Sequence, residues 1–180
     1  RILQGDVGSG KTIVSFMTVA NVLELGCQSA LMAPTAILAN QHFNLAKKVF
    51  DGTKIRIKLL TGKTETKLRN KILTDLRNGE IDLLIGTHAL FQKKIDFKKL
   101  GYIVIDEQHK FGVKQRMSLA DKGGKNCDVL LMSATPIPRT MMLTIYGDMD
   151  VSRLTEKPKN RLPILTYSKP EKSSTAFLAS

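Results

Sequence analysis

Continuous apolar segments, separated by longer amphipathic ones, constrain the fold of this chain more than any other feature of its sequence. In several of these segments, such as Tyr-Ile-Val-Ile at 102–105, every residue is apolar and the pattern does not alternate. A strand of this kind is buried on both faces, which is typical of a parallel sheet covered by helices. The strands predicted on this basis span residues 1–4, 29–33, 55–60, 83–86, 102–106 and 129–133.

Helical patterns occupy most of the chain between the predicted strands. They span residues 11–25, 36–50, 63–78, 113–122 and 139–146. Gly26 and Gly79 each follow such a segment, where a left-handed residue commonly ends a helix. Repeated strand–helix–strand units predict an open α/β fold, a mainly parallel sheet with helices on both faces. Functional sites in such folds gather at the carboxyl ends of the strands.

The length of 180 residues fits one domain, which we expect to span residues 1–155. After Asp150 the alternation weakens, and the remaining segment is rich in proline, lysine and serine. Residues 164–167 could form a short strand. We predict that residues 156–180 are a linker and the truncated start of a following domain.

The net charge of +12, from 28 Lys and Arg against 16 Asp and Glu, favours a polyanionic partner such as nucleic acid. A lysine-rich solvated surface would give the same balance, so the charge alone leaves both interpretations open. No apolar run reaches the ~18 residues of a membrane span and no signal-peptide pattern is present, which predicts a cytoplasmic location without a membrane partner. The two cysteines, Cys27 and Cys127, are too few for a tetrahedral zinc site. We expect both to be reduced thiols in the core.

The segment Gly5-Asp-Val-Gly-Ser-Gly-Lys-Thr12 matches the phosphate-binding pattern G-x-x-x-x-G-K-[ST]. Its glycines let backbone N–H groups turn toward phosphate oxygens, and the following helix adds its positive N-terminal dipole. An incidental glycine-rich turn is disfavoured, because a predicted strand precedes the segment and a predicted helix follows it. Lys11 should reach the β- and γ-phosphates of ATP, and Thr12 should place its hydroxyl on Mg²⁺. The predicted ATP-binding residues are Gly5, Asp6, Val7, Gly8, Ser9, Gly10, Lys11 and Thr12.

Two carboxylates, Asp106 and Glu107, stand where the apolar strand at 102–106 ends. Asp106 can hold Mg²⁺ through its water shell, and Glu107 can accept a proton from the water that attacks the γ-phosphate. Taken alone, they could be a solvated strand end and a turn. Downstream of a phosphate-binding loop, they predict the second half of an ATP site. The predicted catalytic residues are therefore Lys11, Asp106 and Glu107, and the predicted Mg²⁺ ligands are Thr12 and Asp106.

The segment Ser133-Ala-Thr135 stands at the end of another apolar strand. Its two hydroxyls could hydrogen-bond Gln108 and His109 and report the state of the γ-phosphate. A helix cap before Pro136 is the alternative. We predict that Gln108, His109, Ser133 and Thr135 couple the nucleotide to the rest of the molecule.

In order and spacing, these segments resemble motifs I, II and III of superfamily 2 helicases of the Asp-Glu-x-His class, across nearly the whole chain. The resemblance implies a RecA-like P-loop NTPase domain. Ala33-Pro-Thr35 resembles motif Ia and Gly86-Thr-His88 resembles motif Ib, which in this family contact the phosphates of a tracked strand. Thr35, Thr87 and His88 are thereby implied to bind DNA. Thr35 could also cap the following helix, and His88 could be only a turn residue.

Within this class the sequence looks like the RecG family of bacterial DNA helicases. The likeness rests on Gln108 with Phe111-Gly-Val after it, on Gly86-Thr-His-Ala-Leu-Phe91 and on Met132-Ser-Ala-Thr-Pro-Ile-Pro-Arg-Thr140. The related transcription-repair coupling factor usually has Glu at position 108. The resemblance implies ATP-driven movement along duplex DNA that regresses forks and migrates Holliday junctions in recombination and repair. It also implies an upstream wedge domain and a second motor domain downstream.

Other functions use the same motifs. An RNA helicase or a transcription-repair coupling factor could do so, and a regulatory ATP-binding module could switch shape without mechanical work. The presence of Glu107, Ser133 and Thr135 argues against such a module. Hydrolysis in this family needs arginines from the second motor domain, so we expect this chain alone to bind nucleotide weakly and to turn it over poorly. Arg139 could face that domain or DNA, or be solvated; His42 is expected on a helix surface and not as a ligand.

Overall fold

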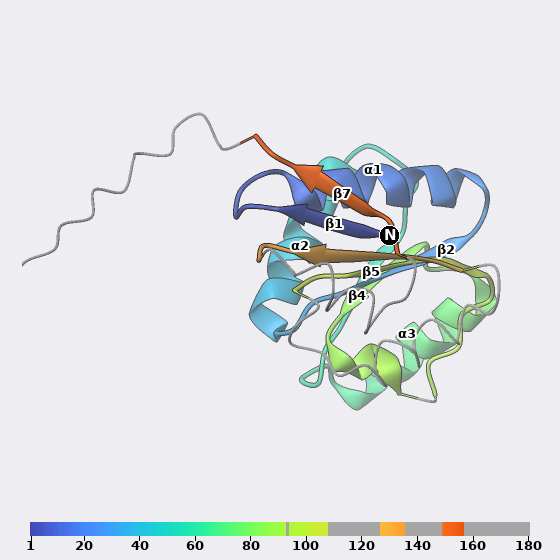
Figure 1. Ribbon diagram of the computed structural model, residues 1–180. Coiled ribbons are helices and arrows are strands. Elements are labelled where there is room, and N and C mark those ends of the chain that lie inside the picture. Colours follow the sequence, from blue (N-terminus) through green and yellow to red (C-terminus); the bar gives the residue numbers. More distant parts are fainter. Residues whose placement is uncertain (93, 108–126, 136–148, 157–180) are drawn as a thin grey trace, which may run out of the picture.

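The computed structural model describes residues 1–92, 94–107, 127–135 and 149–156. Within them, seven strands form one sheet in the order β3-β4-β2-β5-β6-β1-β7, and every pairing is parallel (Figure 1). The strands are β1 (Ile2–Gly5), β2 (Gln28–Met32), β3 (Ile57–Leu60), β4 (Leu83–Gly86), β5 (Leu100–Ile105), β6 (Asp128–Ser133) and β7 (Val151–Leu154). The helices are α1 (Lys11–Glu24), α2 (Ala36–Val49), α3 (Thr66–Asn78) and the short 3-10 helix η1 (His88–Phe91).

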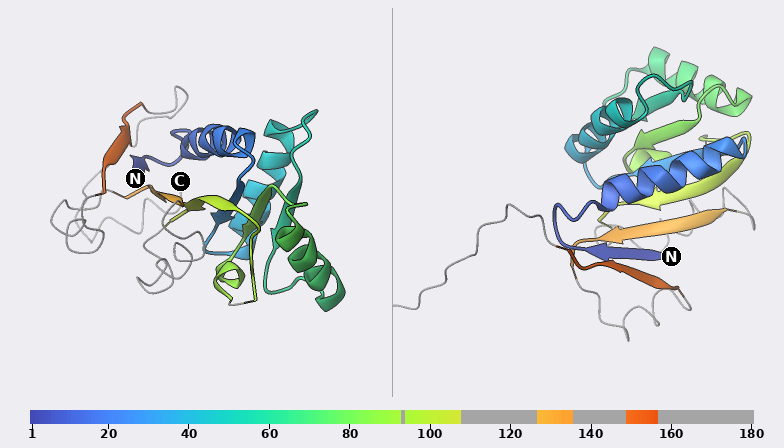
Figure 2. Two further views of the ribbon diagram at one scale, coloured as in Figure 1. Left: turned by 90° about the vertical axis from the view of Figure 1, so that its right-hand side faces the viewer. Right: turned by 90° about the horizontal axis from the view of Figure 1, so that it is seen from above.

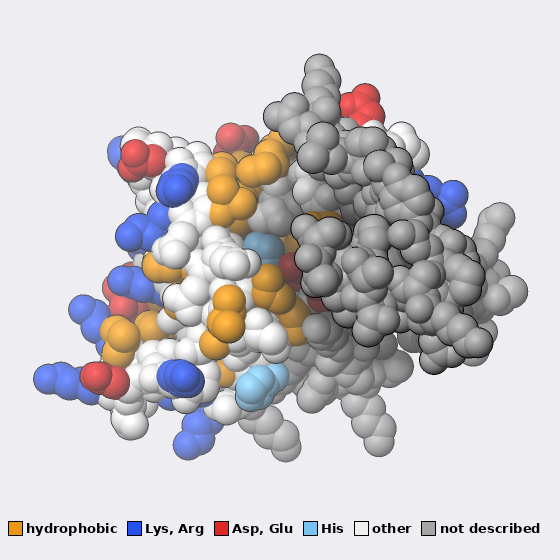
Figure 3. Space-filling model, turned by 90° about the vertical axis from the view of Figure 1, so that its left-hand side faces the viewer, with side chains coloured by type: hydrophobic (Ala, Val, Ile, Leu, Met, Phe, Trp, Pro, Cys, Tyr) orange, Lys and Arg blue, Asp and Glu red, His pale blue; other side chains and the backbone are white. Residues whose placement is uncertain are grey.

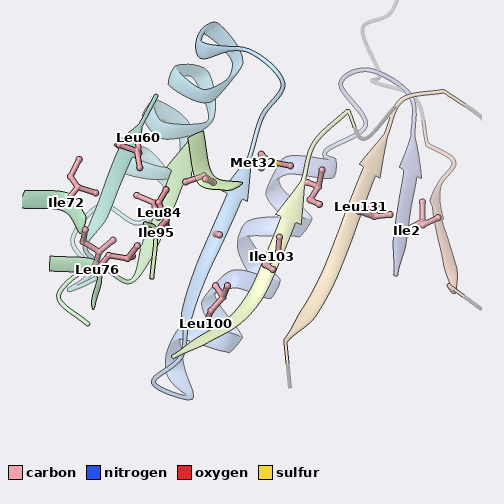
Figure 4. Close-up of a cluster of buried hydrophobic side chains, with 14 residues drawn as sticks. Ile2, Met32, Leu60, Ile72, Leu76, Leu84, Ile95, Leu100, Ile103 and Leu131 are labelled. Carbon is pink, nitrogen blue, oxygen red and sulfur yellow. The ribbon is translucent and has the colours of Figure 1, made fainter. Parts of the chain in front are cut away.

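Side chains of the strands point alternately into two buried clusters, one on each face of the sheet. On one face, Leu83 belongs to a cluster with Phe16 of α1 and Ala39 of α2. On the other face, the next residue, Leu84, belongs to a cluster with Ile72 of α3 (Figure 4). The two views in Figure 2 show helices on both sides of the sheet. The predicted fold class, a parallel α/β sheet with helices on both faces, is confirmed.

Within the described residues, the predicted strands and helices are confirmed, with ends that differ by a few residues. Gly26 and Gly79 have φ angles of +68° and +78°, as expected of glycines that end helices. Strand β7 was not predicted; it pairs with β1 at the sheet edge, and its residues are at most half-buried, so its apolar signal is weak. The helices predicted at 113–122 and 139–146 and the strand predicted at 164–167 lie outside the described residues.

The cysteines depart in part from the sequence prediction. Cys27 and Cys127 are free thiols, as expected, but both are only half-buried. Burial raises the pKa of the Cys127 thiol to about 11, and Asp128 and Cys27 act in the same direction. As for a membrane, no helix in the described part of the chain has the length and apolar character needed to cross one.

The parallel arrangement sends the loops that follow the strands to one edge of the sheet, the left-hand edge in Figure 1. Figure 3 looks onto this carboxyl edge, where Lys and Arg side chains lie mainly along one rim of the described surface. Strands β5, β6 and β1 are consecutive in the sheet. The segments predicted to bind ATP therefore emerge from neighbouring strands.

Candidate functional site

The loop predicted to bind phosphate connects β1 to α1 at the carboxyl edge. Gly8 and Gly10 have φ angles of +81° and +91°, in the left-handed region that glycine adopts without a steric penalty. A Cβ atom on Gly10 would meet no heavy atom within 4 Å, so the loop borders open space there. A Cβ atom on Gly5 would lie 3.0 Å from Cβ of Leu154, because β7 runs close beside the start of the loop.

The side-chain amine of Lys11 forms hydrogen bonds with backbone carbonyls of the loop. Its Nζ donates to the carbonyl oxygens of Gly5 at 2.6 Å and Asp6 at 2.9 Å. The Oγ atom of Ser9 is buried and has no hydrogen-bond partner among the described residues. A buried polar group without a partner costs about 1–3 kcal/mol, which a phosphate oxygen could offset. The amine, the unpaired hydroxyl and the left-handed glycines fit a polyphosphate.

Asp106 follows β5, and both of its carboxylate oxygens have partners. Oδ1 accepts a hydrogen bond from the N–H of Glu107 at 3.0 Å, and Oδ2 lies 2.7 Å from Nε2 of His42. The side chains of His42 and Asp106 are only 8% and 12% exposed. The prediction of His42 as a helix-surface residue was therefore wrong, because α2 turns this side chain inward toward the strand end.

The periodicity of α2 contains a signal for this burial. Ala39, His42 and Ala46 lie on one stripe of the helix, and all three are buried. A polar side chain on a buried stripe requires a hydrogen-bond partner. The identity of that partner, Asp106, depends on the three-dimensional fold, since it lies 64 residues further along the chain.

Glu107 has a φ angle of +48°, the only positive value among the non-glycine residues that the structure describes. A left-handed backbone costs a residue with a Cβ atom roughly 1–2 kcal/mol. Such strain is often found at functional sites, where the surrounding structure maintains it. Glu107 is thus held in an unusual conformation directly after the carboxylate predicted to hold Mg²⁺.

Ser133, at the end of β6, is buried and bonds to Thr135. Their hydroxyl oxygens lie 3.2 Å apart, and the Thr135 N–H donates to Ser133 Oγ at 3.3 Å. Gln4 of β1 joins this segment, since its Nε2 donates to the Thr135 carbonyl at 3.1 Å and its Oε1 accepts from Nε of Arg153 at 3.2 Å. Sequence reasoning missed Gln4 and Arg153, and a single polar residue in the short strand β1 was their only signal.

The residues predicted to contact DNA differ in accessibility. Thr35 is exposed and caps α2, accepting a hydrogen bond from the N–H of Leu38 at 3.2 Å, so its capping role is confirmed. His88 is exposed as well. Thr87 is only 3% exposed, and its Oγ1 has no partner among the described residues. Thr35 and His88 can meet a phosphate directly, whereas the Thr87 side chain would have to be uncovered first.

Some predicted site residues cannot be placed, since Gln108, His109 and Arg139 lie outside the described residues. In the parts that the structure does describe, no group of three or more His, Cys, Asp or Glu side chains could hold a metal ion. A magnesium ion at the candidate site would therefore rely on Thr12, Asp106, phosphate oxygens and water. This is the usual way in which proteins bind Mg²⁺ with nucleotides.

Known proteins resemble the chain along most of its length. The model of the DEAD/DEAH box helicase family matches residues 1–143. The ATP-dependent DNA helicase RecG of Borreliella burgdorferi is 50% identical over 167 residues, and that of Thermotoga maritima is 51% identical over 170 residues. These alignments cover 93% and 94% of the chain. A solved structure of RecG bound to a three-way DNA junction matches 99% of the chain with a TM-score of 0.82 and 44% identity.

The chain spans only a part of these relatives. It covers 24% of the Borreliella protein, 22% of the Thermotoga protein and 24% of the chain in the solved structure. The similarity therefore concerns about a quarter of each relative.

Proposed function

Because this chain belongs to the DEAD/DEAH box helicase family, we propose that it is the ATP-binding motor domain of a bacterial DNA translocase that remodels branched DNA in recombination and repair. The observation that carries this proposal is the convergence of three segments at one edge of the sheet. They are the phosphate-binding loop, the Asp106–Glu107 pair and the Ser133–Thr135 segment, which follow the neighbouring strands β1, β5 and β6. Identity of about 50% to RecG proteins favours branched DNA as the substrate.

In this proposal, each site residue has a task that its chemistry supports. Backbone N–H groups of the loop cradle the phosphates, and Lys11 exchanges its two loop carbonyls for β- and γ-phosphate oxygens. Thr12 binds Mg²⁺ through its hydroxyl, and Asp106 does so through water. Bound Mg²⁺ supplies neutralisation of the phosphate charge. Glu107 orients the attacking water and accepts its proton.

The coupling of nucleotide to DNA is assigned to Gln108, His109, Ser133 and Thr135. The bonded pair Ser133 and Thr135 supports this assignment, because its hydroxyls lie at the end of the strand beside β5. A regulatory ATP-binding module without mechanical work is disfavoured by Glu107, since a pure switch has no need of a catalytic base.

DNA binding is assigned to Thr35, Thr87 and His88 at the carboxyl edge. The net charge of +12 supports a polyanionic partner. A RecG structure at 44% identity is bound to a three-way DNA junction, which favours DNA over RNA for this chain too. A transcription-repair coupling factor, which shares the motifs, remains the nearest alternative and is separated by the DNA structure that stimulates hydrolysis.

The proposed division places the motor domain at residues 1–155 and a linker with the start of a second motor domain at 156–180. A second motor domain and an upstream wedge domain are the proposed partners within the same protein, and the cytoplasm is its proposed location. Because the second domain would supply arginines to the transferring phosphoryl group, this chain alone should hydrolyse ATP poorly.

The test is ATP hydrolysis by the full-length protein with forked DNA, linear duplex, single strands and structured RNA, with residues 1–180 alone as the control. We expect the fork to stimulate hydrolysis most, and Lys11→Ala to remove that stimulation. Stronger stimulation by RNA, or equal stimulation by every duplex, would contradict the branched-DNA proposal. Robust hydrolysis by residues 1–180 alone, abolished by Glu107→Gln, would contradict the dependence on a second domain.

A further inference from the structure

The contact between His42 and Asp106 is short, buried and formed by segments far apart in the chain. An ionised carboxylate can only accept hydrogen bonds, so Nε2 of His42 is the donor. Hydrogen bonds to charged groups contribute more to stability than neutral ones do. None of the sequence motifs that define the candidate ATP site includes His42, although its side chain touches the carboxylate at the centre of that site.

The two partners of Asp106 together fix the orientation of its carboxylate. Oδ1 is held by the backbone N–H of Glu107 and Oδ2 by His42, at 3.0 and 2.7 Å. Rotation of an aspartate carboxylate is otherwise soft, because its terminal torsion has broad minima. Each oxygen has two lone pairs, so each keeps one for a metal-bound water. The arrangement therefore orients Asp106 without blocking it.

The helix that presents His42 is itself well anchored. Ala39 and Ala46 on the same stripe are buried with zero exposure, and Thr35 caps the first turn. The backbone that carries His42 is therefore fixed beside the strand end, and the imidazole itself is only 8% exposed. It acts as a fixed donor on a rigid element, which is the arrangement by which residues around a metal ligand tune metal affinity.

From this geometry we propose that His42 is a positioning residue that holds Asp106 in the orientation that receives Mg²⁺ with the nucleotide. The proposal rests on the function proposed above, because it takes Asp106 as the magnesium carboxylate. Loss of the partner of a direct metal ligand lowers metal affinity by about 10- to 100-fold, and because Asp106 acts through water we expect the lower end of this range. Removing the donor should therefore raise the Mg²⁺ requirement of nucleotide binding and leave Mg²⁺-free nucleotide binding unchanged.

The experiment compares His42→Leu, His42→Gln and the exposed neighbour Gln41→Leu in the full-length protein. Binding of a fluorescent ATP analogue is measured in EDTA and then during a Mg²⁺ titration, and thermal melting checks folding. We expect His42→Leu to raise the half-saturating Mg²⁺ concentration about tenfold or more. His42→Gln should recover part of this loss, because its amide can donate to Oδ2, and Gln41→Leu should behave as wild type.

Two outcomes would overturn the proposal. One is a folded His42→Leu protein with the wild-type Mg²⁺ requirement. The other is an equal loss of Mg²⁺-free nucleotide affinity in His42→Leu and His42→Gln, which would mean that His42 only holds α2 against the sheet. Failure of the proposed function is recognised separately, because the wild-type protein would then show no stimulation of ATP hydrolysis by DNA.

Discussion

The two edges of the sheet satisfy their polar groups in different ways. At the amino edge, where the strands begin, protein groups pair with one another. The buried Gln28 side chain donates to the carbonyl oxygens of Leu76 at 3.0 Å and Ile81 at 2.7 Å, and accepts from the N–H of Lys99 at 3.0 Å. These bonds tie β2 to the end of α3 and to the start of β5. Next to Gln28, however, the hydroxyl of Ser29 is buried without a partner among the described residues.

An ion pair completes the same edge. The guanidinium of Arg56 donates to both carboxylate oxygens of Asp82 and to the carbonyl of Gly79. Burial acts to raise the pKa of Asp82, but hydrogen bonds from the side chain and backbone of Arg56 outweigh burial and lower that pKa below its ordinary value. The pair therefore joins β3 to β4 in its charged form.

At the carboxyl edge, by comparison, some polar groups have no partner and one backbone conformation is strained. The hydroxyls of Ser9 and Thr87 are buried without partners among the described residues, and Glu107 has a left-handed backbone. Unsatisfied groups and strain of this kind are typical of binding and catalytic sites. Since Ser29 at the amino edge also has an unpartnered hydroxyl, the difference rests on the strained Glu107 and on the side-chain network of Gln28, Arg56 and Asp82. We expect the amino edge to stabilise the fold and the carboxyl edge to bind the ligand.

Lys11→Ala should show the difference between the two edges most clearly, because it should lower ATP turnover without lowering stability. We expect ATP turnover by the full-length protein to fall by a factor of about 10²–10³, the loss typical of removing one preorganised donor from a site of developing charge. The free energy of unfolding should change little, because the Lys11 amine contacts only carbonyls of its own loop. Steady-state ATPase assays and urea denaturation measure the two effects, with the exposed Lys48→Ala as control. A large loss of stability in Lys11→Ala would contradict the assignment of the carboxyl edge to ligand binding.

Gly86→Ala tests whether the carboxyl edge also contains structural positions. A Cβ atom at residue 86 would lie 2.2 Å from the carbonyl oxygen of Leu60, a backbone atom that cannot move aside cheaply. We expect a loss of about 3 kcal/mol in the free energy of unfolding, at the upper end for overpacking. Urea denaturation measures it. Gly62→Ala is the matched control, since a Cβ atom there meets nothing within 4 Å, and equal stability of the two variants would contradict the prediction.

The same comparison explains which parts of the fold could be predicted from sequence. Strands β4 and β5 are buried on both faces, so most of their residues are apolar in succession and easily recognised. Strand β2 is buried as well, but only Ala30–Met32 carries this pattern, after Gln28 and Ser29. Strand β7 lies at the sheet edge and contains Ser152 and Arg153, so it lacks that pattern. The order of the strands depends on packing of segments distant in sequence, and no local pattern contained it.

The candidate site divides in a similar way. The conformation of the loop at residues 5–12 was predictable, because the glycines that shape it and Lys11 lie within eight residues, Gly5 to Thr12. The contact of His42 with Asp106 was not, because it requires α2 to pack beside the end of β5. Burial of Thr87 was missed for the same reason, since neighbouring elements cover it in three dimensions.

Gln28→Leu should weaken the amino edge without affecting ATP. The substitution leaves the Ile81 carbonyl and the Lys99 N–H without the Gln28 side chain, whereas the Leu76 carbonyl keeps the N–H of Gly79. A buried unsatisfied group costs about 1–3 kcal/mol, in part recovered by the apolar side chain. We expect a net loss of about 2 kcal/mol in urea denaturation. Gln28→Glu keeps the acceptor for Lys99 but loses both donors, so it should also be destabilised. A lowered nucleotide affinity in a folded Gln28→Leu protein would contradict the assignment of this edge to stability.

Asp82→Asn should give the smallest effect, and its pH dependence identifies the cause. The substitution keeps the shape of the side chain but removes its charge, and we expect a loss of about 1 kcal/mol at neutral pH, since the pair is partly exposed. The pKa of Asp82 is lowered in the folded state, so its contribution is fully present above the unfolded pKa of about 4 and disappears as the pH falls through the lower folded value. Urea denaturation at several pH values should therefore show the wild type and Asp82→Asn converging in acid. A difference in stability that stayed constant with pH would mean that hydrogen-bond geometry, and not charge, stabilises this edge.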